Sequence, residues 1–136
     1  MSDISITAAN VKKRDNTIIK HGIAGATLVA ANVLYQEAST KKMKLGDNDS
    51  GTAEVRAVAG LALHASLDDQ PIAYAVGGEI DVGAVLTAGV DYYLSGTPGA
   101  ICPRADVTTG DDPIRVGIAR TTSILTLDFA DPGVTL

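Results

Sequence analysis

The sequence predicts an all-β protein, a compact sandwich or barrel built from two pseudo-repeated β units with an extended N-terminal arm. Short segments with period-two alternation, separated by turn-rich clusters, are one basis for this prediction. The other is a phrase that occurs twice. Gly25-Ala-Thr-Leu28-Val-Ala30-Ala-Asn-Val-Leu-Tyr35 matches Gly83-Ala-Val-Leu86-Thr-Ala88-Gly-Val-Asp-Tyr-Tyr93, which begins 58 residues later.

A second pair of matching blocks supports the duplication. Gly60-Leu-Ala62 recurs 57 residues later as Gly117-Ile-Ala119. A unit this small cannot bury its own apolar face, so the two copies are expected to fold as one body. We expect an N-terminal arm over residues 1–17 and a single β domain over 18–136. The pseudo-repeats cover about 18–76 and 79–129, with Gly77-Gly78 as the break between them.

Two strands are predicted from alternation of larger and smaller or polar residues, over 72–76 and 124–129. Ile4 and Ile6 alternate with polar residues and indicate an arm or edge strand, followed by a polar loop over 10–16. Clusters rich in Asp, Asn and Gly over 46–51, 108–113 and 131–133 predict turns.

The segment 53–67 is ambiguous, because its Ala and Leu content and apolar spacing favour a helix. Its counterpart over 113–122 holds Pro, Gly and β-branched residues, which favour a strand. If the copies share a fold, both segments are strands. Gly60 and Gly117 then lie where another backbone passes closely.

The composition allows one core, since a chain of 136 residues removes roughly two-thirds of its unfolded surface from water. Its apolar residues are mostly Ala, Val, Ile and Leu, with four Tyr, one Phe and no Trp. Large anchoring side chains are therefore scarce. We expect neighbouring subunits to contribute to stability.

Charge is distributed unevenly along the chain. Residues 1–44 carry seven cations and three acids, a net charge of +4, whereas the remainder carries four cations and thirteen acids, a net charge of −9. The basic leading segment could dock on an acidic surface or could be a solvated arm. The overall net charge of −5 argues against a nucleic-acid partner.

Cys102 is the only cysteine, which excludes an intrachain disulfide. The N-terminus lacks a signal-peptide pattern, and the apolar runs are too short to cross a bilayer. We expect synthesis in a reducing cytoplasm and no membrane partner.

Three short motifs invite chemical interpretations. Lys42-Met43-Lys44 resembles the Met-Lys pair that receives biotin in carrier domains, although a solvated Lys-rich turn explains it more simply. Asp47-Asn48-Asp49-Ser50-Gly51 resembles the start of an EF-hand loop, but its fifth, sixth and twelfth positions hold Gly51, Thr52 and Val58, so that match fails. The acid pairs Asp68-Asp69 and Asp111-Asp112 are predicted to be solvated turn residues.

No catalytic residue, cofactor or metal ligand is predicted. His21 and His64 have no partner at metal-ligand spacing, and there is no Gly-x-Ser-x-Gly elbow or phosphate-binding glycine loop. Cys102 stands between Ile101 and Pro103 without an activating neighbour, which indicates a packed thiol. The sequence does not indicate an enzyme.

The phrase over 83–94, followed by a turn-rich gap and Val116-Gly-Ile-Ala119, resembles the capsid cement or head decoration proteins of tailed bacteriophages. The resemblance covers about residues 18–129. It implies an all-β protein, often trimeric, that binds the major capsid protein on the outer surface of the virion and stabilises the mature shell without catalysis. Ile4, Ile6, Lys12, Lys13 and Arg14 are then the candidate contacts with the capsid or with another subunit.

The first copy departs from the phrase at two places. It has Ala30-Ala31-Asn32 where the second copy has Ala-Gly, so Asn32 is expected to take the backbone role of Gly. It also has a Lys-rich stretch, interpreted as an insert over 41–44, where the second copy has Thr97-Pro-Gly. Alternative functions are a phage tail or fibre adaptor, a carbohydrate-binding β module, and an enzyme or carrier domain using Lys44, Cys102 or the acid pairs.

Overall fold

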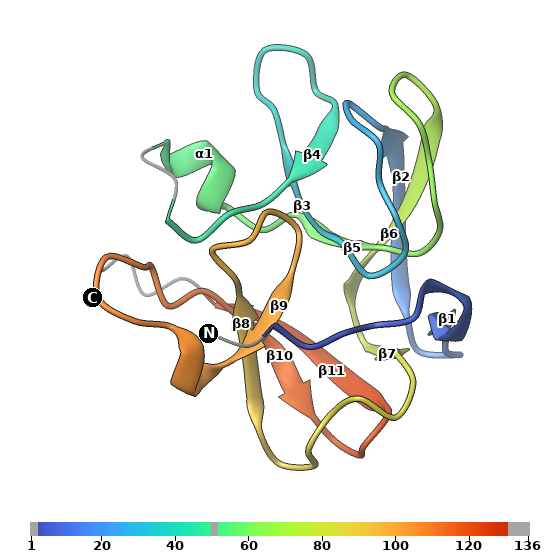
Figure 1. Ribbon diagram of the computed structural model, residues 1–136. Coiled ribbons are helices and arrows are strands. Elements are labelled where there is room, and N and C mark those ends of the chain that lie inside the picture. Colours follow the sequence, from blue (N-terminus) through green and yellow to red (C-terminus); the bar gives the residue numbers. More distant parts are fainter. Residues whose placement is uncertain (1–2, 50–51, 131–136) are drawn as a thin grey trace.

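The computed structural model describes residues 3–49 and 52–130, and nearly all of the regular structure in this part is β (Figure 1). Two antiparallel sheets hold six and five strands. The helical elements there are short: α1 (Ala53–Arg56) and the 3-10 turns η1 (Ala8–Asn10) and η2 (Arg104–Asp106). The all-β prediction is confirmed. Within these residues no helix is both long and apolar enough to traverse a bilayer.

The five-stranded sheet is formed by the first unit of the chain. Its spatial order is β2 (Ile18–Ile23), β6 (Pro71–Gly77), β5 (Gly60–Ala62), β3 (Val33–Gln36) and β4 (Met43–Leu45). The predicted strand at 72–76 lies within β6. The six-residue strand β2 stands at one edge, with Ile18 59% exposed.

The six-stranded sheet is formed by the second unit and one N-terminal strand. Its spatial order is β1 (Lys12–Lys13), β7 (Glu79–Asp81), β11 (Ile124–Ala130), β10 (Arg115–Ala119), β8 (Asp91–Leu94) and β9 (Ile101–Pro103). Without β1, the chain order of these strands across the sheet is the same as in the first unit. The duplicated phrase therefore accompanies a duplicated chain path.

The phrase itself forms an equivalent turn in each unit, leading into β3 and β8. Leu28 and Leu86 are both buried, and their backbone N–H groups donate to Ser66 at 2.8 Å and Thr122 at 2.9 Å. Three residues further on, the N–H groups of Ala31 and Gly89 each donate at 2.7 Å to the last residue of β5 and of β10. The shared residues thus fix the same backbone hydrogen bonds twice.

The expectation that Asn32 replaces the turn glycine is wrong. Ala31 itself takes the left-handed conformation, with φ of 70°, where Gly89 has φ of 83°. Asn32 supports the turn through its side chain, because its Oδ1 accepts a 2.8 Å hydrogen bond from the N–H of Val29. The Asn32 side chain thus stabilises the turn, and Ala31 takes the unfavourable left-handed conformation.

The Lys-rich stretch is a substitution and not an insert. Six residues separate β3 from β4, and six separate β8 from β9. Lys41, with φ of 63°, stands two residues before β4, as Gly99, with φ of 77°, stands two residues before β9. The two hairpins have the same length, and only their side chains differ.

The segment over 53–67 combines both of its possible structures. Gly60–Ala62 is a strand, as the comparison of copies predicts, but Ala53–Arg56 forms one helical turn, so a strand is wrong for its start. Ala, Glu and Arg are good helix formers, and no neighbouring strand pairs with this stretch. The close approach at the glycines is confirmed. A Cβ on Gly60 would lie 2.6 Å from the Ala75 carbonyl oxygen, and one on Gly117 would lie 2.3 Å from that of Thr126.

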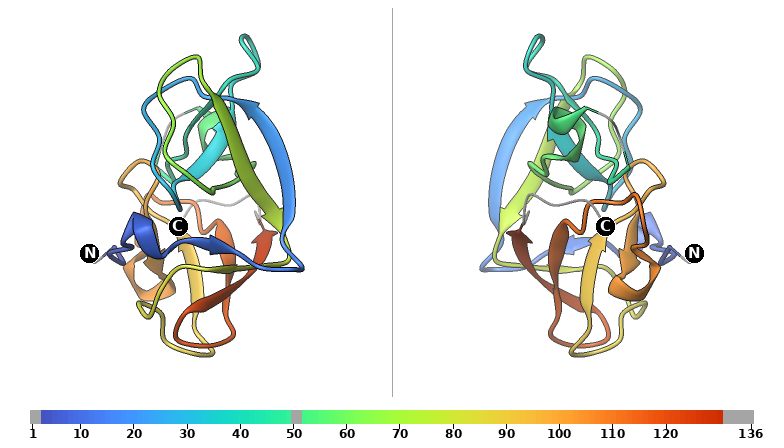
Figure 2. Two further views of the ribbon diagram at one scale, coloured as in Figure 1. Left: turned by 90° about the vertical axis from the view of Figure 1, so that its right-hand side faces the viewer. Right: turned by 90° about the vertical axis from the view of Figure 1, so that its left-hand side faces the viewer.

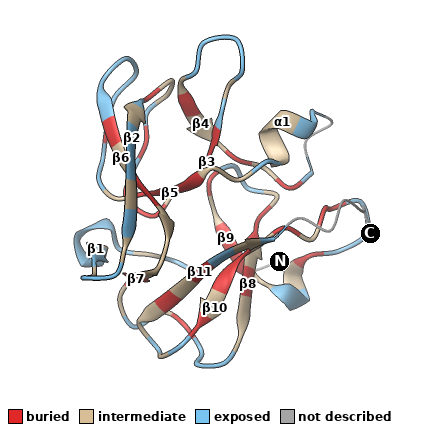
Figure 3. Cartoon of the chain, turned by 180° about the vertical axis from the view of Figure 1, so that it is seen from behind, coloured by how far each residue is buried: buried red, intermediate tan, exposed pale blue. Residues whose placement is uncertain are grey.

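The two units share their main hydrophobic core. Val33, Leu61 and Ala75 of the first unit belong to the same buried cluster as Ile80 and Leu125 of the second (Figure 3). A smaller cluster lies within the first unit, formed by Ala24, Leu28, Leu34, Met43, Ala62, Ile72 and Tyr74.

Backbone hydrogen bonds also join the units at the turn before β9. Gly99 accepts from the N–H of Val33 at 3.0 Å and donates to the carbonyl of Gly46 at 2.7 Å. In the side views of Figure 2 the two units stack, and the N-terminal segment crosses beneath the first. The turn of one unit is thus part of the packing of the other.

Candidate docking surface

The N-terminal segment lies against the second unit. The N–H of Ile4 donates a 2.9 Å hydrogen bond to the carbonyl of Ile101 in β9, and the Asp3 carboxylate accepts from the hydroxyl of Ser95. Ile4 and Ile6 are half-buried and pack against the shared core. No strand forms at Ile4–Ile6, so the edge-strand alternative is wrong here. Among the described residues, the N–H of Ile4 is the one backbone group of this segment that bonds to a strand.

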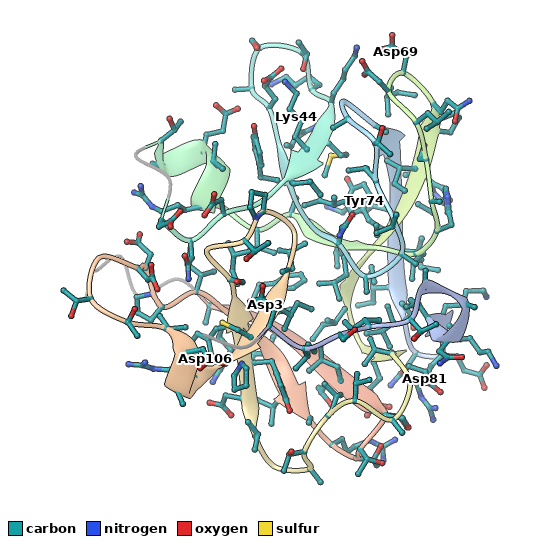
Figure 4. The ribbon with its side chains drawn as sticks, viewed as in Figure 1. Asp3, Lys44, Asp69, Tyr74, Asp81 and Asp106 are labelled. Atoms are coloured by element: carbon teal, nitrogen blue, oxygen red, sulfur yellow. The ribbon has the colours of Figure 1, made fainter. Side chains whose placement is uncertain are left out.

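Strand β1 places two lysines on the surface beside β7. Lys12 pairs with Asp81 and Lys13 with Ile80 in backbone register, and both lysines are exposed. Together with Arg14 and Asp15 they line a hollow of about 320 Å³, whose position is marked by Asp81 in Figure 4. Within the residues that the structure describes, neither ammonium group has a carboxylate at ion-pair distance. Their charges are available to a partner.

Arg14 is engaged with its own chain through Glu79 of β7. Its Nε lies 3.7 Å from one carboxylate oxygen, which also accepts a 3.2 Å hydrogen bond from the Asn16 amide. Arg120 forms an ion pair with the same carboxylate, and the Thr126 hydroxyl donates to it at 3.4 Å. Glu79 therefore ties the residues that follow β1 to the β10–β11 hairpin and helps to fix the position of the lysines.

A groove of about 150 Å³, lined mostly by apolar residues, lies beside the N-terminal segment. It is lined by Ile4 and Ile6, the turn over 29–32 and residues 99–101. Val29 at its rim is 47% exposed. Among the described residues the large exposed hydrophobic side chains are Ile18, Ile23, Val29 and Leu67, all in the first unit. Three of them lie outside the groove, and single exposed apolar side chains are ordinary on protein surfaces.

The residues considered for a carrier or nucleophilic role are placed unfavourably. Met43 is fully buried in β4, and Lys44 in the same strand forms a 2.7 Å ion pair with Glu37, so neither lies at a hairpin tip. Cys102 is fully buried, and burial raises the pKa of its thiol to about 12, with Asp3, Asp106 and Asp111 adding to the shift. That thiol remains protonated near neutral pH.

The two histidines lie on the first unit, in separate settings. His21 is exposed in β2. His64 accepts a 3.0 Å hydrogen bond from the N–H of Ala73 at Nε2, which leaves Nδ1 to donate to the Ala65 carbonyl at 2.8 Å. Over residues 3–49 and 52–130, no three His, Cys, Asp or Glu side chains converge as a metal site.

The two acid pairs differ from each other. Asp68 and Asp69 are exposed in a turn beside Lys42, as predicted. Asp111 and Asp112 are buried, so the solvated interpretation is wrong for them. Asp111 accepts from the N–H of Thr108 at 3.1 Å, and Asp112 forms a 2.7 Å ion pair with Arg56. A local backbone donor for Asp111 and an arginine from the first unit for Asp112 compensate for the burial of the two carboxylates.

Sequence reasoning identified Arg14 as a candidate contact but did not identify Glu79 or Arg120. The residues that Glu79 contacts lie 41 or more positions away in the chain, so no local spacing reveals them. The local sequence offers one weak indication of a role for Glu79, which is its position directly after Gly77-Gly78.

Comparison with known proteins yields no assignment: neither the models of known protein families nor the curated proteins include a match to this chain.

Proposed function

We propose that this chain is a structural capsid cement protein, which binds the outer surface of a phage head as a trimer and stabilises the mature shell. The observation that carries the proposal is the pair of exposed lysines, Lys12 and Lys13, held in a fixed strand on an otherwise acidic chain. A rigid basic surface of this kind suits an acidic partner surface. The major capsid protein is the proposed partner.

The duplicated sheets supply the rigidity that such a role needs. Both units share one buried core, and Glu79 ties the basic strand to that body. The apolar groove beside Ile4 and Ile6, with Val29 at its rim, is the proposed contact between copies. Burial of this groove in a trimer adds apolar area that a core with few large aromatics lacks.

The mechanism is binding to one state of the shell. A protein that binds only the mature arrangement of capsid subunits adds its binding free energy to that arrangement alone. Repetition of modest contacts by symmetry gives a large total without one tight site. No reaction is required of the chain.

The experiment measures co-sedimentation of the protein with heads of the phage that encodes it, together with the melting temperature of those heads. We expect binding, a raised head melting temperature and a trimer by light scattering. The variant K12E/K13E should bind heads at least about tenfold more weakly, whereas K20E/K41E, with the same change in charge at exposed sites away from the hollow, should bind normally. A monomer without effect on heads contradicts the proposal, and binding to tails instead would favour the adaptor alternative.

A further inference from the structure

The loop that follows β4 is held firmly between the two units. The N–H groups of Gly46, Asp47 and Asn48 donate to the carbonyls of Val33, Val55 and Ser95 at 2.9, 3.2 and 3.1 Å. The Asn48 carbonyl in turn accepts a 3.0 Å bond from the N–H of Asp112. The backbone of this loop therefore has a fixed conformation and is in contact with both repeats.

Asn48 has one polar atom that this arrangement does not satisfy. The side chain is fully buried, and its Nδ2 donates a 2.8 Å hydrogen bond to the Leu94 carbonyl. Its Oδ1 has no hydrogen-bond partner among the described residues. Buried carbonyl oxygens are rarely left unpaired, so this oxygen requires a partner that the chain does not supply.

The Asp49 carboxylate is directed to the same place. Its Oδ2 and the Asn48 Oδ1 lie 3.1 and 3.3 Å from the point where a Cβ on Gly96 would stand. Only a residue without a side chain leaves this point open to both oxygens. The amide oxygen and the carboxylate oxygen therefore converge at the loop.

Asp47 adds a second carboxylate. One of its oxygens accepts a 3.1 Å hydrogen bond from the N–H of Asp49, which holds the Asp47 carboxylate against the backbone of that residue. Burial raises the pKa of Asp47 to about 6, and the carboxyls of Asp49 and Asp111 contribute to the shift. In the described part of the chain no Lys or Arg forms an ion pair with any of these three acids.

We propose that Asp47, Asp49 and the Oδ1 of Asn48 bind a calcium ion. All three donors are hard oxygens, which Ca²⁺ prefers, and the ion would supply the partner that the Asn48 oxygen lacks. The third protein ligand is an amide, so the site does not need three acidic side chains. Water completes the coordination, and Asp111 contributes charge from the second unit. The site differs from an EF-hand, whose later ligand positions are missing here.

An ion at this loop would strengthen the contact between the two repeats, because the loop is hydrogen-bonded to β3 on one side and to segments 94–96 and 111–112 on the other. Two carboxylates and water ligands correspond to the weak class of calcium sites, with a dissociation constant of about 10⁻⁴ to 10⁻³ M. Mg²⁺ binds less well, since it demands a strict octahedral geometry and retains its water.

The test is thermal unfolding of the full chain in EGTA and in up to 10 mM CaCl₂ or MgCl₂ at constant ionic strength. At the highest calcium concentration we expect a rise in melting temperature of about 4–13 °C across that range of dissociation constants, with a smaller rise in magnesium. The variant D47N/D49N should lose the rise. The control D68N/D69N, with the same charge change in the exposed turn beside Lys42, should keep it.

The outcome that overturns the proposal is no calcium-dependent rise, or an equal rise in both double variants, which would reflect general attraction to an acidic protein. A second measurement covers the case of a poorly folded double variant. The single variants D47N and D49N each keep one carboxylate and should each lose part of the calcium-dependent rise. A full rise in both single variants would also overturn the proposal.

Discussion

In the first unit, a segment of the same unit hydrogen-bonds to the last strand of the sheet. In the second unit, a segment from outside the repeat makes the equivalent hydrogen bond. In the first, the N–H of Gly25 donates a 2.8 Å hydrogen bond to Met43 at the start of β4. In the second, the equivalent carbonyl belongs to Ile101 at the start of β9, and the N–H of Ile4 donates to it at 2.9 Å. The N-terminal segment thus completes the second unit.

The same segment reaches both edges of the six-stranded sheet. Ile4 bonds β9 at one edge, and β1 pairs with β7 at the other. Unpaired strand edges invite association with other chains, so covering them has value beyond stability. The comparison teaches that two units with one chain path can differ in which part of the chain protects their edges.

The largest expected effect comes from the glycines that both units share. Gly117→Ala places a Cβ 2.3 Å from the Thr126 carbonyl oxygen, and Gly60→Ala places one 2.6 Å from that of Ala75. Since a backbone must move in each case, we expect losses of about 3 kcal/mol or more in the free energy of unfolding, greater for G117A. Urea denaturation measures both. Gly22→Ala, whose Cβ would have 3.4 Å to its nearest neighbour, should cost about 1 kcal/mol or less. Equal effects for G22A and G117A would contradict the explanation.

A smaller effect is expected from loosening the segment that closes only the second unit. Ile4→Ala with Ile6→Ala removes two half-buried side chains from the core and should reduce the free energy of unfolding by about 2–3 kcal/mol. The matched change Ser5→Ala with Thr7→Ala affects exposed side chains and should be within about 0.5 kcal/mol of the parent.

Cys102 reports where this loosening occurs, because it lies in β9 next to the residue that Ile4 contacts. The buried thiol, with its pKa raised to about 12, should react with iodoacetamide at pH 8 only after local opening. We expect faster alkylation in I4A/I6A than in S5A/T7A. Unchanged alkylation would show that β9 does not depend on the N-terminal segment.

The smallest effect concerns the turn that both units share. Ala31→Gly relieves a left-handed alanine and should stabilise the protein by about 0.5–1 kcal/mol. Gly89→Ala imposes the same backbone strain on the second unit and should destabilise the protein by about 1 kcal/mol. A steric clash adds nothing to this cost, because a Cβ on Gly89 would meet no atom within 4 Å. Thermal melting of the two variants gives the comparison. Shifts of the same sign would show that the turns are not equivalent.

The duplication made much of the fold predictable from sequence. Alternation identified β6 and β11, and Gly117 in a strand-like context corrected a helical reading around Gly60. The positions at which the backbone angle φ is positive were not predictable in the same way. At Ala30-Ala31-Asn32 composition favours Asn for a left-handed residue, but Ala31 takes that conformation, as the equivalent Gly89 does, and the Asn32 side chain instead accepts a hydrogen bond from the N–H of Val29.

The candidate site was predictable only in part, because its geometry depends on distant residues. Lys12 and Lys13 were identified by charge alone, and the structure places them on an exposed strand. Their fixed position depends on Glu79, and the burial of Asp112 depends on Arg56 and Asn48, which approach from the first unit. Contacts of this range leave no local pattern in the chain.

The turn at Gly99 has a consequence for how such a protein could be divided. Its two backbone hydrogen bonds reach into the first unit, to Val33 and Gly46, and a Cβ on Gly99 would lie 2.7 Å from Leu45. Cutting the chain at Gly77-Gly78 would therefore produce two fragments that each lack part of the other's packing surface. Such fragments are suited to complementation, in which reassembly of the pair and folding of each half are one event.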